Sequence, residues 1–190
     1  MNERILVNPV TKEKVEVLAM AAETNGDYSM DEGIMLPDGT NCLHYHRILT
    51  QTFTALEKPL YIYLGGKDII KLSQGESYTI KPGVVHGIFN PTKHTVRYRL
   101  VTTPGHEGFE NMCRILSGLA DDNKVNADGI PHDYTTTALL MEMGDTYFMS
   151  AHTFIHPWVK WKARQARKKG IAQELLSKYC PTWIQKPNSI

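Results

Sequence analysis

The sequence Gly39-Thr-Asn-Cys-Leu-His-Tyr-His-Arg-Ile-Leu-Thr-Gln51 places two histidines, His44 and His46, two positions apart. Residues i and i+2 of a β-strand point to the same face, so both imidazoles can reach one point in space. A second segment, residues 75–90, reads Gly-Glu-Ser-Tyr-Thr-Ile-Lys-Pro-Gly-Val-Val-His-Gly-Ile-Phe-Asn and supplies a third histidine, His86, after a Pro-Gly turn. A single ion can therefore be shared by the three imidazoles.

Gln51 stands where a fourth donor, an oxygen, would complete this set. Three neutral imidazoles and one oxygen are a familiar ligand set for a first-row transition metal. The sequence therefore predicts one divalent ion (Fe, Mn, Ni, Cu or Zn) held by His44, His46, Gln51 and His86. Two arrangements stay open: Gln51 coordinates through its neutral amide oxygen, or it leaves a three-histidine face open to water and substrate.

Together the two segments resemble the paired signature of the cupin superfamily, in which a glycine, an H-x-H pair and a glutamate precede a block G-x5-P-x-G-x2-H-x3-N. The matching positions are His44, His46, Gly75, Gly83, His86 and Asn90. The departures are Gln51 for the glutamate, Lys58 for a closing glycine, Lys81 at the usual proline position with Pro82 after it, and Gly39 one residue nearer than usual. The resemblance covers residues 39–90, and quercetin-dioxygenase-like members are the nearest in motif layout.

The resemblance implies a mainly β protein: a cupin double-stranded β-helix (jelly-roll) barrel with a C-terminal helical appendage. Residues 1–104 would form the barrel with its N-terminal strands, and residues 105–190 a helical extension packed on the barrel or on a partner subunit. The implied function is that of a metal-dependent small-molecule enzyme of dioxygenase, isomerase or decarboxylase type. The alternative is a non-catalytic metabolite-binding cupin, which Gln51 favours because an amide removes the ionisable oxygen of the usual glutamate. No catalytic base is assigned.

Short apolar segments separated by turns run from residue 12 to residue 104 and are typical of a sandwich or barrel. The expected strands are Glu13–Leu18, Ser29–Leu36, Cys42–His46, Thr52–Leu56, Leu60–Leu64, Asp68–Leu72, Ser77–Ile80, Gly87–Phe89 and Val96–Thr102. After Pro104-Gly105 the apolar residues recur at three- and four-residue intervals, which predicts helices at Phe109–Ala120, Tyr134–Met143 and Pro157–Tyr179.

In a barrel, alternate residues of each strand face the lumen. His44 and His46 should therefore face inward, with His86, Ile88 and Asn90 on the facing wall. The lumen should be an apolar pocket with a polar floor, as small-molecule sites generally are.

Other side chains near the motifs follow the same alternation. Tyr45 and Arg47 have the opposite parity to the histidines and should lie outside the barrel or at its rim. Arg97 and Arg99 share one face of their strand and Tyr98 takes the other, and the sequence does not say which face is inside.

Composition fits an ordinary globular protein of one domain, with 42% hydrophobic and 22% charged residues among 190. There is no apolar run long enough for a membrane span or a secretion signal, so we expect a cytoplasmic protein. Three scattered cysteines, Cys42, Cys113 and Cys180, fit a reducing compartment, and Cys42 is interpreted as a small buried hydrophobe. No nucleophile elbow, phosphate-binding loop or dinucleotide-binding fingerprint is present.

Charge is concentrated at the C-terminus. Residues 158–190 hold eight Lys and Arg and one acid, whereas the rest of the chain holds 13 basic and 19 acidic residues. A basic helix with Trp158 and Trp161 has the composition of a membrane or nucleic-acid binder, but we favour a solvated face whose apolar stripe packs on the acidic barrel of the same or a neighbouring subunit. That stripe would contain Trp158, Trp161, Ile171, Leu175 and Tyr179. The expected partners are a small-molecule ligand and a second copy of the chain in a homodimer, with no nucleic acid or membrane.

Overall fold

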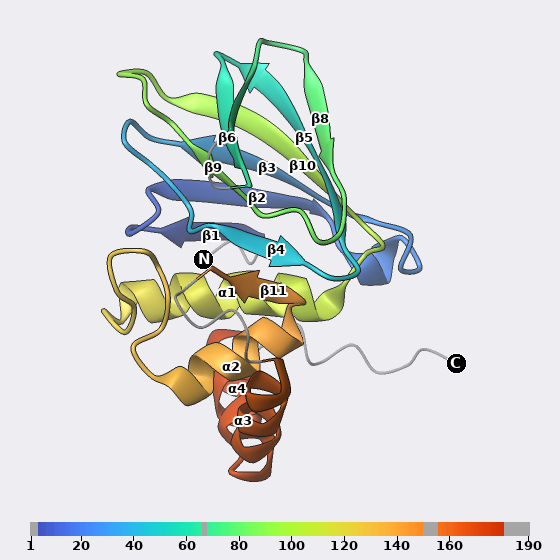
Figure 1. Cartoon of the computed structure of the whole chain (residues 1–190), viewed down its shortest axis with the longest axis vertical. Coiled ribbons are helices and arrows are strands. Elements are labelled where there is room, and N and C mark those ends of the chain that lie inside the picture. Colours follow the sequence, from blue (N-terminus) through green and yellow to red (C-terminus); the bar gives the residue numbers. More distant parts are fainter. Residues whose placement is uncertain (1–3, 66–67, 150–155, 181–190) are drawn as a thin grey trace.

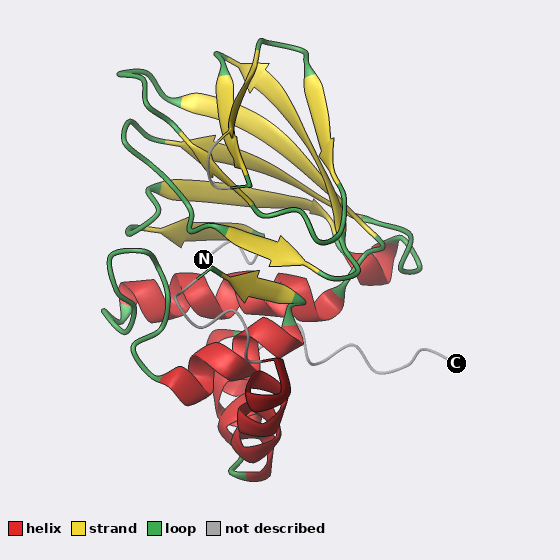
Figure 2. Ribbon diagram, viewed as in Figure 1, coloured by secondary structure: helices red, strands yellow, loops and turns green. Residues whose placement is uncertain are grey.

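The computed structural model describes residues 4–65, 68–149 and 156–180. Two antiparallel sheets face each other, and helices cover one end of the pair (Figures 1 and 2). In order, the larger sheet contains β1 (Ile5–Asn8), β2 (Glu13–Ala19), β3 (Ser29–Met35), β10 (Val96–Thr103), β5 (Thr50–Glu57) and β8 (Ser77–Ile80). The smaller sheet contains β11 (Thr146–Phe148), β4 (His44–His46), β9 (His86–Phe89), β6 (Leu60–Leu64) and β7 (Asp68–Leu72). The predicted mainly β, jelly-roll architecture is confirmed.

Alternation along each strand decides which side chains enter the space between the sheets. In β5, Gln51, Phe53 and Ala55 are buried and point inward, whereas Thr52 and Thr54 point outward. The outward hydroxyls form a cross-strand ladder with β8, with oxygen–oxygen distances of 2.9 and 2.8 Å to Thr79 and Ser77. The inward faces of both sheets build the main core, whose buried members are Met35, Phe53, Ala55, Leu60, Ile62, Leu72, Ile80, Ile88, Val96 and Tyr98.

The Pro-Gly turn joins the two motif segments. Gly83 has a φ of 83°, in the left-handed region that costs glycine little. Its N–H donates to the carbonyl oxygen of His46 at 2.7 Å, so the turn before β9 is bound to the end of β4. The second segment is thereby held against the first, which places His86 beside the histidine pair.

Four helices follow the strands and lie below the barrel in Figure 1: α1 (Glu107–Asp121), α2 (Tyr134–Met143), α3 (His156–Lys168) and α4 (Ile171–Tyr179). α1 contacts β1 and α4, and α2 contacts α3 and β11. A second apolar cluster joins α1 to its neighbours, with Met112, Ile115 and Leu119 of α1 packed near Leu140 of α2. These contacts hold the helices against the open end of the two sheets.

All nine expected strands are present, with ends shifted by at most two residues, and the first two expected helices are present as well. Two strands were missed. β1 is a four-residue edge strand, and β11 lies within the segment predicted to be helical, where it adds an edge to the smaller sheet beside β4. The division into parts at residue 104 stays a prediction.

The single helix predicted over Pro157–Tyr179 is wrong. Gly170 has a φ of 76°, which ends α3 and allows α4 to start in a new direction. The predicted apolar stripe is broken there: Leu175 and Tyr179 pack near α1, whereas Trp158 and Trp161 are 37% and 53% exposed.

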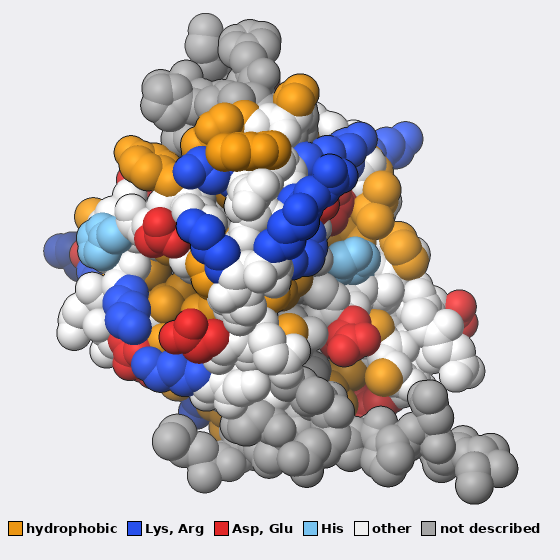
Figure 3. Space-filling view, turned by 90° about the horizontal axis from the view of Figure 1, so that it is seen from below, with side chains coloured by type: hydrophobic (Ala, Val, Ile, Leu, Met, Phe, Trp, Pro, Cys, Tyr) orange, Lys and Arg blue, Asp and Glu red, His pale blue; other side chains and the backbone are white. Residues whose placement is uncertain are grey.

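The basic residues gather on the helical end of the molecule, where Lys and Arg side chains form a band in the view from below (Figure 3). Two of them pair with acids on neighbouring helices rather than on the barrel. Arg167 pairs with Glu142 of α2, and Lys178 pairs with Asp122 at 2.5 Å. These ion pairs tie α3 and α4 to the other helices, while Val159 of α3 packs against the cluster of Met141, Tyr147 and Phe148, the last two in β11 of the smaller sheet. Packing on the barrel of a neighbouring subunit stays a prediction. Within the part of the chain that the structure describes, no helix has the length and apolar character needed to cross a membrane.

Candidate metal centre

The structure brings the three predicted histidines together. His44 and His46 project from β4, and His86 lies directly opposite His44 in the β4–β9 pairing. Nitrogens from all three rings, one from each, lie within 4.8 Å of one another. The rings are buried, with exposed fractions of 8%, 2% and 1% for His44, His46 and His86. Gln51, 2% exposed, reaches them from β5 in the opposite sheet.

Each imidazole is held by a backbone carbonyl on its Nδ1 side. The Nδ1 atoms of His44 and His86 lie 2.8 and 3.0 Å from the carbonyl oxygens of Cys42 and Val84, two residues earlier in each case. The Nδ1 atom of His46 lies 2.9 Å from the carbonyl oxygen of Asp145. A carbonyl can only accept, so Nδ1 carries the proton in each ring. Each Nε2 is then left with a lone pair.

These lone pairs fit a cation. The Nε2 atom of His46 is buried without a hydrogen-bond partner among the described residues. The Nε2 atom of His86 lies 3.0 Å from Oε1 of Gln51. Because Nδ1 of His86 donates to Val84, Nε2 of His86 and Oε1 of Gln51 are both acceptors. They repel each other unless a positive ion lies beside them or the Gln51 amide is turned over. The donor set therefore fits a transition-metal ion.

Protonation of the rings is disfavoured. Burial lowers the pKa of His86 to about 4 and also lowers the pKa of His46. Burial, with the nearby His86 and His46, holds the pKa of His44 well below its ordinary value. Neutral imidazoles are the form that binds metals, so near pH 7 the three rings are ready to act as ligands.

Asp145 is a positioning residue that the sequence did not reveal. It is 7% exposed and has a φ of 47°, in the left-handed region. Its Oδ2 accepts hydrogen bonds from the backbone N–H groups of Arg47, Ile48 and Leu49 at 2.9, 2.8 and 3.3 Å, while its carbonyl holds His46. The turn after β4 is thus fixed by a residue about one hundred positions later. The sequence around Asp145, Gly144-Asp145-Thr146, matches no motif that would have indicated this role.

The start of α1 covers the site. His106 caps this helix, its Nδ1 accepting from the N–H of Phe109 at 3.0 Å. The Phe109 ring stands edge-on to the His46 ring, with centroids 5.7 Å apart. His106 thus has a structural role at the start of α1.

A cavity of about 170 Å³ opens between the two sheets and α1. His44, Gln51 and Ile88 line it near the histidine cluster, as does Cys42, whose pKa burial raises to about 12. The lining is mainly apolar, as predicted, but its polar groups are not confined to a floor, because carboxylates of β2, β3 and α1 also line it. Its volume is below the roughly 300–1,000 Å³ of drug-sized pockets, so it suits a small metabolite.

Asn90 was predicted to line this pocket, and that prediction is wrong. Its side-chain amide donates to the carbonyl oxygens of Met35 and His94 at 3.2 and 2.8 Å, and its Oδ1 accepts from Thr92. It fixes the turn after β9 instead. Alternation failed here because the strand ends at Phe89.

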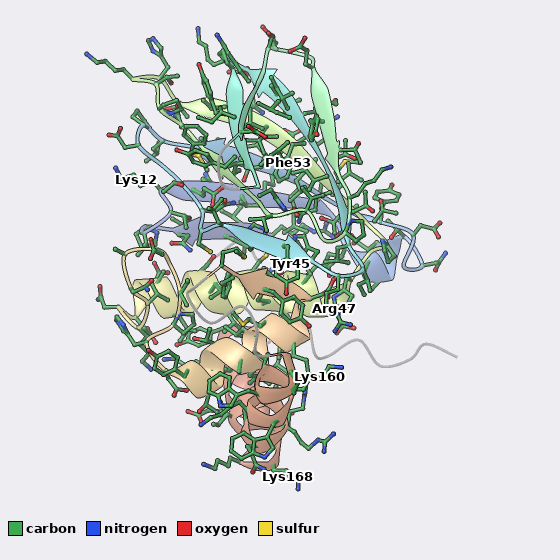
Figure 4. All side chains as sticks on the ribbon, in the orientation of Figure 1. Lys12, Tyr45, Arg47, Phe53, Lys160 and Lys168 are labelled. Atoms are coloured by element: carbon green, nitrogen blue, oxygen red, sulfur yellow. The ribbon has the colours of Figure 1, made fainter. Side chains whose placement is uncertain are left out.

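The side chains of opposite parity lie as predicted. Figure 4 shows Tyr45 and Arg47 on the side of the barrel nearest the helices, and the Tyr45 ring stacks on Tyr147 of β11 at 5.3 Å. Phe53 lies between the sheets in the same view. In β10 Tyr98 is buried inside, and the outward Arg97 and Arg99 pair with acids on the outer face.

Comparison with known proteins gives matches to solved structures alone. No protein-family model and no curated protein matches the sequence. The chain is similar to an uncharacterised protein with a double-stranded β-helix domain from Klebsiella pneumoniae, at 22% identity over 47% of this chain and 75% of that one, with a TM-score of 0.43. It is similar to the polyketide cyclase RemF from Streptomyces resistomycificus, at 19% identity over 53% and 69%, with a TM-score of 0.45. An RmlC-like cupin from Shewanella frigidimarina matches at 21% identity over 57% and 92%, with a TM-score of 0.47.

We expect Asp145→Ala to lower the free energy of unfolding by about 3 kcal/mol, because three backbone N–H groups, that of Leu49 buried and the other two partly buried, lose a carboxylate acceptor. Asp145→Asn keeps one acceptor oxygen and tolerates the left-handed backbone, so it should cost only about 1 kcal/mol. Urea unfolding of the two variants measures both values. Equal losses for Ala and Asn would contradict the role of Oδ2.

Asp31, which lines the cavity from β3, makes stability depend on pH. Burial, with the nearby charge of Glu110, raises its pKa from 3.8 to about 7. Between these values the folded state holds a proton that the unfolded state has released, so stability should fall as pH rises from about 4 to 7. Asp31→Asn should make this slope shallower, because Glu13 and Glu110, whose pKa values burial also raises, still contribute to it. The variant should be more stable than wild type at pH 8, on the order of 2 kcal/mol.

The measurement is urea unfolding across this pH range. Asp68→Asn, at an exposed position of β7, makes the same chemical change outside the cavity and should keep the wild-type slope. A slope that is as steep in Asp31→Asn as in wild type would rule out a contribution from Asp31.

Proposed function

We propose that this chain, a cupin-type double-stranded β-helix protein, binds one divalent transition-metal ion through His44, His46 and His86 and uses it to act on a small molecule. The observation that carries the proposal is the hydrogen bond that all three imidazoles share. Each ring is held at Nδ1 by a backbone carbonyl, so its Nε2 keeps a lone pair that can bind an ion. A buried Nε2 without a partner is costly unless a ligand satisfies it. Metal binding offsets that cost.

Such an ion would supply Lewis acidity, polarising an oxygen of the bound substrate. The residues of the chain supply the rest. The carbonyl contacts keep the imidazoles in one tautomer, which preserves the geometry of the donor set. Phe109 and the first turns of α1 cover the rings and limit the access of bulk water. Within this proposal, isomerase, decarboxylase and dioxygenase chemistry all remain candidate reactions.

The alternative, a metabolite-binding module without turnover, is supported by one contact. If the Gln51 amide is turned so that its NH₂ group donates to Nε2 of His86, the 3.0 Å pair is satisfied with no ion. Gln51 also cannot titrate, so it offers no base for proton transfer. Assembly as a homodimer and a cytoplasmic location are further proposals, which rest on the sequence.

Metal analysis of protein purified without added metal or a histidine tag tests the proposal. We expect nearly one equivalent of Fe, Mn, Ni, Cu or Zn in wild type and less than about a tenth of that in His44→Ala/His86→Ala, since one remaining imidazole is a weak site. His132→Ala, which removes an exposed histidine, should retain the metal. Circular dichroism must show that the double variant is folded. A wild type that stays metal-free after reconstitution would overturn the proposal.

Gln51→Glu distinguishes the two functions. A carboxylate next to the ion should tighten metal binding by about tenfold, which is 1.4 kcal/mol, whichever function is correct. An enzyme that depends on the neutral amide should also change its turnover sharply once a substrate is known, whereas a binding module should change in metal affinity alone. Metal titration gives the first readout, and weaker binding in the variant would show that residue 51 does not lie beside the ion.

A further inference from the structure

The cavity beside the histidines is acidic. Among the described residues that line it, four carry carboxylates and one, Arg114, carries a guanidinium. The carboxylates are Glu13 of β2, Asp31 of β3, Glu110 of α1 and Asp128. Burial raises the pKa of Glu13, Asp31 and Glu110, and the charge of Arg114 offsets part of this effect at Glu110.

The carboxylates differ in how far they are satisfied by the protein. Oε1 of Glu13 accepts from the hydroxyl of Tyr98 at 2.8 Å, and Oε1 of Glu110 accepts from the N–H of Ala21 at 2.7 Å. The Asp31 carboxylate forms no hydrogen bond or ion pair with any residue of the described ranges, and partial burial is the largest cause of its raised pKa. A half-buried carboxylate that faces a cavity without a protein partner is suited to bind a cation.

The Tyr98 hydroxyl, a possible donor near Asp31, is already used elsewhere. A Cβ atom at Gly33 would collide with the Tyr98 ring, so glycine makes room for the ring against β3. The hydroxyl then donates to Glu13. The Thr11 hydroxyl, in the same wall and 8% exposed, lies near the Glu13 carboxylate and helps to lower its pKa. Asp31 is therefore the carboxylate of this wall that the described residues leave without a hydrogen bond.

Strand register places Asp31 near the histidine cluster without touching it. Asp31 pairs with Leu100, which pairs on its other side with Phe53, and Gln51 is one inward-facing position from Phe53 along β5. One small molecule in the cavity can thus contact both Asp31 and the side chains of His44 and Gln51.

We propose that the cavity selects a small substrate carrying an ammonium group, which Asp31 binds, together with an oxygen that faces the histidine cluster. This specificity rests on the proposed small-molecule function of the site. An anion, by contrast, would meet a wall with more carboxylates than basic groups. The substrate class is therefore an amino alcohol or a similar amine-bearing metabolite rather than a carboxylic acid.

Three matched probes test the charge preference: 3-aminopropan-1-ol, propane-1,3-diol and 3-hydroxypropanoate. They share a three-carbon frame and a hydroxyl group and differ in the charge at the other end. With wild-type protein at pH 8 and constant ionic strength, NMR titration should show the ammonium probe binding about tenfold tighter than the diol, and the anion weakest. In Asp31→Asn the ratio of ammonium to diol affinity should fall below about threefold while diol binding is kept.

Asp68→Asn, with the same change of charge at an exposed site, should retain the wild-type ratio. Circular dichroism of both variants checks that the fold is intact. Equal binding of the three probes, preference for the anion, an unchanged ratio in Asp31→Asn, or no binding of the ammonium probe would each overturn the inference. Metal content measured on the same samples separates this failure from failure of the proposed function, because the histidines can hold metal whether or not Asp31 binds an amine.

Discussion

The antiparallel pairing of β4 with β9, which sets His44 directly opposite His86, is the constraint on which the site depends. Once this register is fixed, three imidazoles must occupy a space too small and too dry for charged rings. The backbone resolves the crowding by taking the Nδ1 proton of each ring into a hydrogen bond with a carbonyl. All three lone pairs are then directed away from those carbonyls, and the cluster becomes a set of ligands rather than a set of mutually repelling cations.

The site could be predicted from the sequence only where each histidine and the carbonyl that holds it lie close together in the chain. His44 and His86 are held by carbonyls two residues earlier, so each short motif segment contains both the ring and its hydrogen-bond partner. His46 uses the carbonyl of Asp145, and the strand β11 that brings Asp145 there is only three residues long. Three residues carry too little periodicity to be seen within a segment that is otherwise helical. The break between α3 and α4 at Gly170 was not predicted either, because a glycine within a helical pattern does not by itself indicate a break.

The side chains that line the cavity differ in charge from one part of its wall to another. Near the histidines the protein offers neutral donors, including the Gln51 amide, whereas the wall formed by β2, β3 and α1 carries carboxylates. Because burial and the charge of Glu110 raise the pKa of Asp31, we expect its ionisation to lower stability at neutral and higher pH. A residue that costs stability and faces a cavity is more readily explained by a ligand than by packing, since asparagine of almost the same shape would fill the position without the charge.

Proton–nitrogen correlation NMR of the metal-free protein at about pH 7 tests the central claim most directly, because it reports the protonation of each imidazole nitrogen. The account predicts that His44, His46 and His86 are neutral, with Nδ1 protonated and Nε2 bare. A proton on Nε2 of His46, or a charged imidazolium at any of the three, would contradict it.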